Sequence, residues 1–219
     1  MKKKIIIFMI VLFLVAFSIP FINNELTGNH VLGNGMYNYT SPNNRTFSFE
    51  KGFVGENERH LLYYYNLVDI GGDVGRKELI KIPFRYGPYD IEEIHMDNVR
   101  KDIIDAEVIY FTRDYNLDRL TDQKDGIAML TLMRVLDDST SPDIYKIPTS
   151  IAITEAVDGV DSPVIGCVQS TAERRIIELR QGEENRIYKE GECIVMEFVT
   201  ADDSIKVATK LTYHVLGIM

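Results

Sequence analysis

The two cysteines, Cys167 and Cys193, are the residues whose chemistry depends most directly on the compartment of the protein. They are 26 positions apart, and each lies in or beside a short apolar segment typical of a β-strand. Outside the cytoplasm an even pair of cysteines indicates a disulfide, which would add roughly 3–4 kcal/mol to stability by closing the loop. Two buried free thiols are the alternative. Neither cysteine has a histidine beside it in the sequence, which argues against a catalytic thiol.

A run of oxygen-bearing side chains near the middle of the chain has the spacing of a calcium loop. Its members are Asp114, Asn116, Asp118, Asp122 and Asp125. Alternate residues in such a loop point their oxygens at one ion. Two departures weaken the match, because Arg119 stands where glycine makes the sharp turn and an aspartate replaces the final glutamate. The alternatives are a calcium site and a polar loop whose aspartates cap the following helix. We expect no other cofactor.

Other catalytic signatures are missing from the sequence. The four histidines, His30, His60, His95 and His214, include no pair at the i, i+4 spacing of a helical zinc site. There is no Cys-x-x-Cys and no Gly-x-Ser-x-Gly. The glycine-rich stretch 71–75 lacks the Lys-Ser/Thr of a phosphate loop. We therefore assign no catalytic residue, and we leave open a glycosidase-type pair of distant carboxylates.

Two Asn-X-Ser/Thr sequons lie close together in the first quarter of the chain. Asn38-Tyr39-Thr40 and Asn44-Arg45-Thr46 make Asn38 and Asn44 candidates for glycosylation in an exported protein. The motif is short, so chance occurrence is the alternative.

The N-terminus has the pattern of a membrane anchor or a signal peptide. Three lysines, residues 2–4, precede an uncharged apolar run from Ile5 to Ile22. At about 1.5 Å per residue this run is long enough for a helix to cross a bilayer. Cleavage near Ser18 would instead release a secreted protein. We favour the anchor, because the run is longer than the ~7–15 residue core of a signal peptide.

The charge distribution supports export of the rest of the chain. The 24 Lys and Arg against 33 Asp and Glu give a formal net charge of −9. Without the three N-terminal lysines, 21 positive and 33 negative charges remain, so residues 23–219 carry −12. The positive end should stay in the cytoplasm, and the acidic remainder should lie outside it. Such an acidic body argues against nucleic acid as a partner.

The sequence divides into three expected parts. Residues 1–22 form the signal anchor or signal peptide, and residues 23–50 form a polar stalk in which seven of 28 residues are asparagine. Residues 51–219 form a single extracytoplasmic globular domain of a size that supports a real core. The stalk contains both sequons and is expected to bury little.

Alternating and periodic apolar residues predict the elements of this domain. A β-hairpin is expected from His60–Ile70 and Glu78–Phe84. Further strands are expected over 106–112, 149–154, 164–168, 176–179 and 193–199, and helices over 90–104 and 127–136, with Asp125 as a cap. The pattern indicates an α/β or α+β fold with a mixed β-sheet layered by helices, preceded by one N-terminal transmembrane or signal helix.

The final segment predicts an amphipathic helix that packs on the sheet. Thr200 and Asp203 form a variant of the capping box at its start. The apolar side chains Ile205, Ala208, Leu211, Val215 and Met219 recur on one face. Lys206 and Lys210 are expected to face away from the sheet.

The end of the chain resembles a known group of proteins. The segments Cys193-Ile194-Val195-Met196-Glu197, Lys206-Val207-Ala208-Thr209-Lys210-Leu211 and Leu216-Gly217-Ile218-Met219 look like the closing strand–helix unit of uncharacterised secreted archaeal proteins, some of them S-layer-associated. The resemblance implies a cell-envelope setting and assigns no catalytic residue.

These observations favour a non-enzymatic, membrane-anchored or exported cell-envelope protein that acts as a structural or binding module. Its expected partners are the membrane, through the N-terminal helix, and another envelope protein. The alternative is an extracytoplasmic hydrolase or solute-binding domain. A hydrolase requires a pocket that gathers carboxylates or a histidine of perturbed pKa, whereas a binding module requires only an exposed patch or sheet edge.

Overall fold

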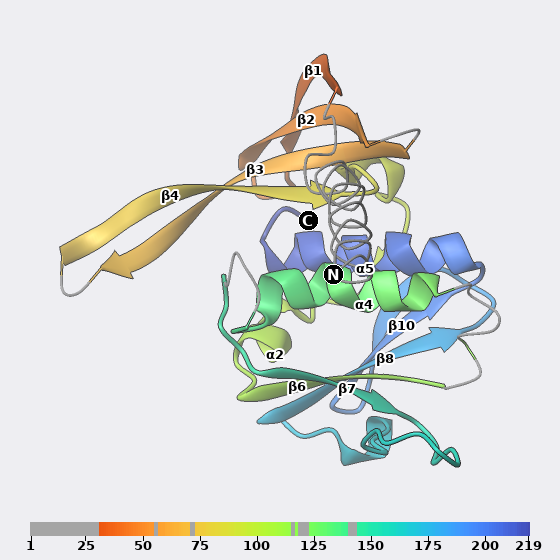
Figure 1. Cartoon of the computed structure of the whole chain (residues 1–219). Helices are drawn as coiled ribbons and strands as arrows, with labels where there is room; N and C mark the ends of the chain where they lie inside the picture. The colour runs from red at the N-terminus through yellow and green to blue at the C-terminus, as the bar shows by residue number, and fades with distance from the viewer. Residues whose placement is uncertain (1–30, 55–56, 71–72, 115–116, 118–122, 140–143) are drawn as a thin grey trace, which may run out of the picture.

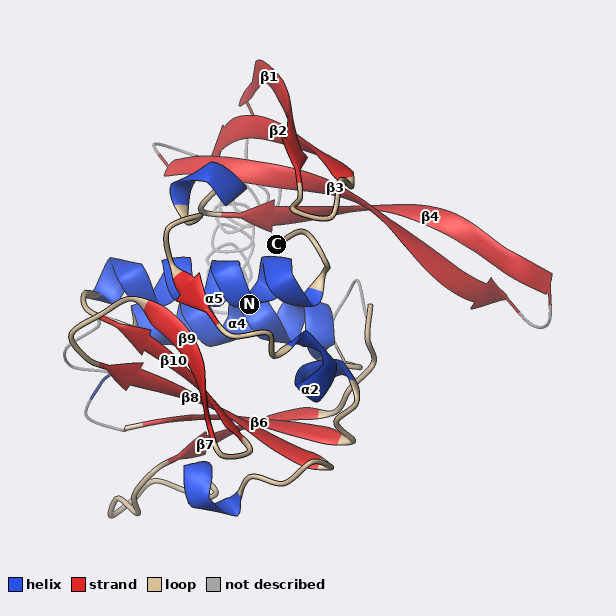
Figure 2. Cartoon of the chain, turned by 180° about the vertical axis from the view of Figure 1, so that it is seen from behind, coloured by secondary structure: helices blue, strands red, loops and turns tan. Residues whose placement is uncertain are grey.

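The computed structural model describes residues 31–54, 57–70, 73–114, 117, 123–139 and 144–219. The expected N-terminal helix and residues 23–30 of the expected stalk lie outside these ranges. Within the described part, no helix has both the length and the apolar character needed to cross a membrane. The fold is mixed α/β, with two sheets and the main helices between them (Figures 1 and 2).

The first sheet is antiparallel and follows the chain order β1-β2-β3-β4. Its strands are β1 (Val31–Thr40), β2 (Thr46–Val54), β3 (Asn57–Ile70) and β4 (Asp73–Phe84). The hairpin expected from residues 60–84 is confirmed as the β3–β4 pair. The pairing of β2 with β3 reaches only Ser48↔Tyr63, whereas β3 and β4 remain paired out to Ile70↔Asp73. The far half of the hairpin therefore leaves the sheet as a two-stranded arm, which projects to the left in Figure 1.

The second sheet is mixed, with the order β5-β9-β10-β8-β6-β7. Its strands are β5 (His95–Met96), β6 (Val108–Arg113), β7 (Thr149–Ile153), β8 (Arg174–Gln181), β9 (Arg186–Glu190) and β10 (Cys193–Phe198). Strands β7, β6, β8 and β10 are mutually parallel, and β9 is antiparallel to β10.

Two long helices lie between the sheets, α4 (Lys124–Leu136) and α5 (Ala201–Val215). A short α2 (Arg100–Ile104) and two 3-10 turns, η1 (Pro88–Asp90) and η2 (Cys167–Gln169), complete the helical elements of the described chain. The capping prediction for α5 is confirmed, because the Thr200 side chain accepts from the Asp203 amide and the Asp203 carboxylate reaches back to the Thr200 amide.

Helix α5 is buried from both sides, so polar residues such as Ser204, Thr209 and Thr212 are buried together with its apolar ones. Tyr213 packs against Phe49 and Phe84 of the first sheet, with ring centroids 5.7 and 4.5 Å apart. The opposite side of the helix packs on β10 and β9 of the second sheet. Lys210 was expected to face away from the core, and this was wrong. Lys210 is buried, and its ammonium group is satisfied there because Nζ donates to the Glu92 carbonyl at 3.1 Å.

The expected boundary between stalk and domain at residue 50 was wrong. Residues 31–40 and 46–54 form β1 and β2, and their side chains Tyr39, Phe47 and Phe49 are buried in the main core. In the described part of this segment, Asn38 lies between Tyr37 and Tyr39, and Asn43 and Asn44 lie in the turn between the strands. Period-two alternation of polar and aromatic residues in this segment indicates a half-buried strand rather than a linker.

Three local expectations also failed, and one strand was not expected at all. Residues 90–104 form η1, β5 and the short α2 instead of one helix, and only residue 164 of the expected strand 164–168 makes a bridge. Strand β9 was missed, because Arg186–Glu190 is too polar to look like a strand. Asp125 is not the cap of α4; Gln123 holds that position, and Asp125 is buried in an ion pair with Arg113.

Candidate binding surface

The first sheet has one face against the helices and one face in solvent. Side chains alternate along each strand, so Phe49, Leu62 and Ile82 are buried on the helix side. The opposite face, which we call the outward face, carries Met36, Asn38, Ser48, Glu50, Tyr63, Tyr65, Leu79 and Lys81. Met36 is 59%, Tyr65 65% and Leu79 45% exposed, so this face presents apolar and aromatic side chains to solvent.

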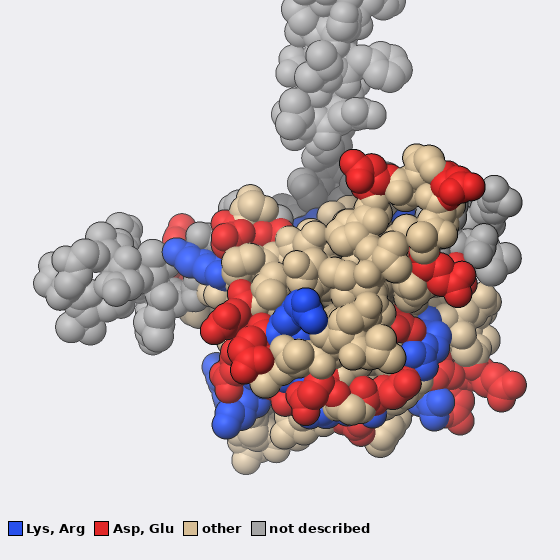
Figure 3. Space-filling view, turned by 90° about the horizontal axis from the view of Figure 1, so that it is seen from below, with Lys and Arg blue, Asp and Glu red and all other residues tan. Residues whose placement is uncertain are grey.

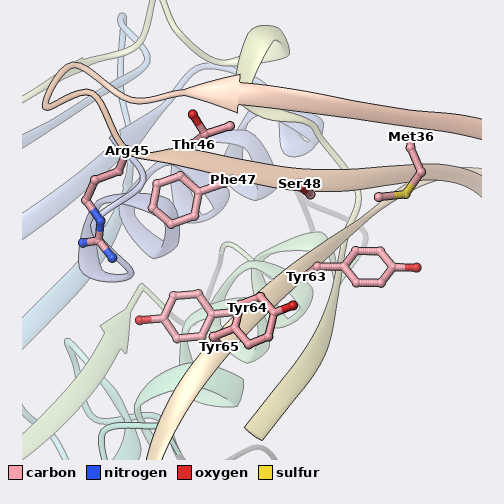
Figure 4. A pocket seen from close by; sticks show the side chains of 8 residues that line it. All are labelled: Met36, Arg45, Thr46, Phe47, Ser48, Tyr63, Tyr64 and Tyr65. Carbon is pink, nitrogen blue, oxygen red and sulfur yellow. The ribbon is translucent and has the colours of Figure 1, made fainter. Parts of the chain in front are cut away.

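A cleft opens where the hairpin arm separates from β2. Its volume is about 350 Å³. It is lined by Met36, Arg45, Thr46, Phe47, Ser48, Tyr63, Tyr64 and Tyr65 (Figure 4). Tyr63 and Tyr64 leave β3 in opposite directions (Figure 4), and the register places Met36 and Tyr63 on the outward side and Phe47 on the inner side. The cleft therefore joins the outward face to the inner edge of the sheet.

The polar side chains of the outward face hydrogen-bond to one another, and the Lys81 ammonium lies over the Tyr63 ring. The Tyr63 hydroxyl donates to Glu50 Oε2 at 2.5 Å, and Lys81 Nζ lies 4.8 Å from the centroid of the Tyr63 ring. Ser48 Oγ donates to Asn38 Oδ1 at 2.9 Å. These contacts hold Tyr63 in place, while Tyr65 two residues on is the more exposed ring.

The inner wall of the cleft is tied to the C-terminal helix. Burial raises the pKa of Tyr64, whose side chain interacts with Tyr145. The Tyr145 hydroxyl donates to the Val215 carbonyl at 2.6 Å, at the end of α5. The Arg45 guanidinium lies 5.4 Å from the centroid of the Phe47 ring. The base of the arm is therefore held by the body of the protein.

Both predicted glycosylation sites lie beside this surface. Asn38 and Thr40 are exposed on β1, two residues apart and hence on the same face of the strand. Asn44 is exposed in the β1–β2 turn with a φ of 60°. Glycosylation of these two asparagines stays a prediction.

A second cluster surrounds His60, a residue that the sequence did not single out for chemistry. Tyr37 Oη lies 2.7 Å from His60 Nδ1, and His60 Nε2 lies 3.1 Å from Glu58 Oε1. Burial lowers the pKa of His60, against the opposing effects of Asp90 and Glu58. A neutral imidazole matches these contacts, with Nδ1 accepting from the tyrosine and Nε2–H donating to the glutamate.

The neighbourhood of His60 limits what that cluster does chemically. Burial also raises the pKa of Tyr37 above its usual range, so its hydroxyl stays protonated. A cavity of about 320 Å³ adjoins the pair. Both ring nitrogens of His60 are used within the cluster, which is the pattern of a structural hydrogen-bond chain rather than of a base beside a nucleophile.

The cysteine prediction is confirmed, because Cys167 and Cys193 form a disulfide. It joins η2 to the start of β10 on the face of the second sheet that is turned away from the helices. The carboxylate of Glu178 lies within 4.8 Å of both sulfurs, and it accepts from Arg180 Nε at 2.8 Å. Thiolates bind metals and disulfide sulfurs do so poorly, so this group suits a structural crosslink.

Charged side chains on the same face pair with one another. Arg180 binds Glu178 and Glu190, and Arg186 binds Glu197 at 2.9 Å. A cavity of about 500 Å³ lies beside them at the carboxyl ends of the parallel strands. The view from below shows acidic and basic groups mixed across this side of the molecule (Figure 3).

The predicted calcium ligands are only partly described. Asn116, Asp118 and Asp122 lie outside the described residues. Asp114 lines the cavity at the end of β6, and Asp125 is engaged by Arg113. The structure thus gives Asp125 a partner other than an ion, and the calcium site stays a prediction.

The sequence analysis missed the outward face, although its signal is present. Residues 60–65 read HLLYYY, and alternation places Leu62 and Tyr64 inward and Tyr63 and Tyr65 outward. Comparison of the chain with protein-family models, with curated proteins and with solved structures finds no match.

Proposed function

We propose that this chain is a membrane-anchored or exported, non-enzymatic module of the cell envelope whose outward face binds saccharides. The observation that carries the proposal is the pair of tyrosines beside the cleft at the base of the arm, the half-exposed Tyr63 and the exposed Tyr65. Export is supported by the Cys167–Cys193 disulfide, because such bonds persist mainly outside the cytoplasm, and by the acidic body behind three N-terminal lysines.

The chemistry of the outward face matches an amphipathic ligand with apolar ring faces and hydroxyl edges. Residues i and i+2 of a strand are about 6.7 Å apart, so Tyr63 and Tyr65 can contact neighbouring rings of one chain. Tyrosine offers a rigid aromatic surface with a polar tip. Asn38, Ser48 and Glu50 supply hydrogen-bonding groups around it. Sugars combine these two kinds of surface.

The size of the face favours a saccharide over a protein partner. Four strands about 4.8 Å apart and three rows of side chains about 6.7 Å apart give a plane of about 200 Å². A stable protein interface buries roughly 800 Å² on each partner. The cleft of about 350 Å³ falls within the range of small-ligand sites, which begins near ~300 Å³.

A non-enzymatic role is supported by how the titratable groups are used. The His60 ring is engaged on both nitrogens, by Tyr37 and by Glu58. On the second sheet Glu178 and Glu190 flank Arg180 instead of facing each other across an open space. Two carboxylates that shared a pocket without such a cation would favour the hydrolase instead.

The test is retention of the protein on saccharides from its own envelope. Full-length protein made in a bacterium without N-glycosylation would be kept in a detergent that has no sugar headgroup. It would be passed over the immobilised polysaccharide fraction of the source cell envelope. We expect wild type to be retained, and Tyr65→Ala to weaken retention about tenfold, equivalent to about 1.4 kcal/mol.

The matched control is Leu130→Ala, because Leu130 is 56% exposed on α4 and lies away from the outward face. It should be retained like wild type. Equal retention of all three proteins would show that binding does not use this face. Absence of retention for wild type would contradict the proposed function.

A further inference from the structure

We propose that Asn38 carries an N-linked glycan whose first sugars lie over Ser48 and Tyr63 and fill the saccharide site of the same molecule. This inference rests on the proposed function in one respect, since it assigns the outward face affinity for sugar. It adds a modification site and a means of regulation that the site alone does not imply.

The sequon around Asn38 is presented for transfer by the strand itself. Asn38 and Thr40 are both exposed, and the pleat points both to the outward side of β1. The Asn38 Oδ1 accepts from Ser48 Oγ at 2.9 Å, which orients the side-chain amide with its oxygen toward Ser48 and leaves Nδ2 out of that bond. β1 is an edge strand of the sheet, so nothing in the described chain pairs beyond it.

The register of the sheet brings the sugar to the tyrosines. Asn38 pairs with Ser48, Ser48 with Tyr63, and Tyr63 with Lys81, so the four residues form one row across the face. With strands about 4.8 Å apart, Tyr63 lies about 10 Å from Asn38. The first two rings of a glycan on Nδ2 span that distance. Tyr65 and Met36 lie on either side of the row.

Met36 and Tyr65 are exposed side chains that a glycan on Asn38 would cover. Met36 is 59% and Tyr65 65% exposed, although both stand on an ordered sheet. Exposed apolar side chains that gather beside a cleft mark a candidate site for a ligand or partner. A glycan on Asn44 starts from the turn at the end of β1 and β2, and that site is not in the row that contains Tyr63.

The covalent step needs one co-reactant, a lipid-linked oligosaccharide. Asn38 Nδ2 forms a bond to C1 of the first sugar, and the bond from C1 to the lipid phosphate oxygen breaks. The lipid phosphate leaves with the electron pair, and a base of the transferase takes one proton from the amide nitrogen. No atom is oxidised or reduced in this exchange.

The experiment compares protein purified from source cells with three variants made there. Thr40→Val removes the sequon but keeps Asn38 and its bond to Ser48. Thr40→Ser keeps the sequon, and Asn44→Asp removes the other sequon with a residue that also tolerates positive φ. Glycopeptide mass spectrometry, nitration of Tyr65 by tetranitromethane and retention on the envelope polysaccharide would be measured.

We expect a glycan on Asn38 of wild type, and nitration of Tyr65 at least threefold slower than in Thr40→Val. Thr40→Val should be retained on the polysaccharide, whereas wild type, Thr40→Ser and Asn44→Asp should pass through. An unmodified Asn38, or equal nitration in wild type and Thr40→Val, would overturn the inference. Failure of the unglycosylated bacterial protein to bind would instead contradict the proposed function, so the two failures are distinguishable.

Discussion

Gly87 lies directly against the hydrogen bond between Tyr37 and His60. A Cβ at this position would stand 2.6 Å from Tyr37 Oη and 2.7 Å from His60 Nδ1. Its φ of −80° is ordinary for any residue, so space rather than backbone conformation requires glycine. Position 87 requires glycine because Tyr37 and His60 lie too close to the backbone there for any side chain.

Gly87→Ala should destabilise the protein by about 1–3 kcal/mol, because the new methyl group must displace the tyrosine or the imidazole. Gly126→Ala is the matched control, since a Cβ there meets nothing within 4 Å and the residue lies inside α4. That change should stabilise by about 0.5–1 kcal/mol. Urea unfolding would measure both, and equal effects would refute the steric explanation.

One buried histidine, His60, and one half-buried histidine, His214, should make stability depend on pH near neutrality. Burial lowers the pKa of His60, beside Glu58, Asp90 and Lys51, and of His214, whose Nδ1 lies 2.9 Å from the Met219 carbonyl. A lowered pKa means that the unfolded chain binds protons first. The stabilisation is therefore complete above about pH 6.5 and is lost as the pH falls from there through the folded-state pKa.

The measurement is the free energy of unfolding between pH 7.5 and 5. We expect it to fall with pH in wild type, and to fall less steeply in His60→Gln and in His214→Gln. The double variant should have the flattest profile in this window. A wild-type slope that survives both substitutions would show that other groups cause it.

At the scale of elements, helix α5 combines a capping motif that the sequence specifies with burial that only the two sheets provide. Its first turn is closed by the reciprocal contacts of Thr200 and Asp203, and Lys206 Nζ binds Asp203 Oδ1 at 2.8 Å. Its middle is buried by both sheets. The cap fixes where the helix starts, and the sheets decide how deeply it is buried.

Thr200→Ala should cost about 1 kcal/mol, because it leaves a first-turn amide without its acceptor. Thr131→Ala is the control, since the Thr131 hydroxyl donates within α4 to the Ile127 carbonyl and caps nothing. It should change stability by less than about 0.5 kcal/mol. Thermal unfolding followed by far-UV circular dichroism would compare the two, and a larger loss for Thr131→Ala would count against the capping role.

For the whole molecule, the disulfide restrains the long connection between β7 and β8. Cys167 lies in the loop segment that covers the second sheet, and Cys193 lies at the buried start of β10. The crosslink spans 26 positions of chain. It therefore ties a segment with little regular structure to the most buried strand of the sheet.

Cys167→Ala with Cys193→Ala should lower the free energy of unfolding by roughly 3–4 kcal/mol, from the loop entropy of the unfolded chain. Wild type with a thiol reductant should lose a similar amount. The double variant should be insensitive to the reductant, which separates the crosslink from side effects of the reagent. Guanidinium unfolding would measure all four conditions, and an equally stable double variant would contradict this role.

The sequence by itself determined the elements whose signals are local. Short-range spacing predicts the cap at Thr200, the period of α5 and the antiparallel pairing of β3 with β4, and the two cysteines have only each other as partners. Each depends on residues within a few positions, or on there being a single possible partner. For the same reason the mixed α/β class could be predicted without an order for the strands.

Only the tertiary structure decided which surfaces are covered. The sequence alone assigns Tyr39, Phe47 and Phe49 to a polar stalk, whereas in the fold they are buried in the main core. It also predicts an exposed Lys210, whereas in the fold the Lys210 Nζ donates to the Glu92 carbonyl. Tyr63 and Tyr65 lie on the outward face because side chains alternate along β3, and the helices of the described chain cover only the opposite face of the sheet. Burial of a side chain depends on residues that are distant in the sequence. The spacing of residues 60–65 therefore predicts strand β3, but only the packing of the sheet on the helices decides which of its tyrosines form a surface.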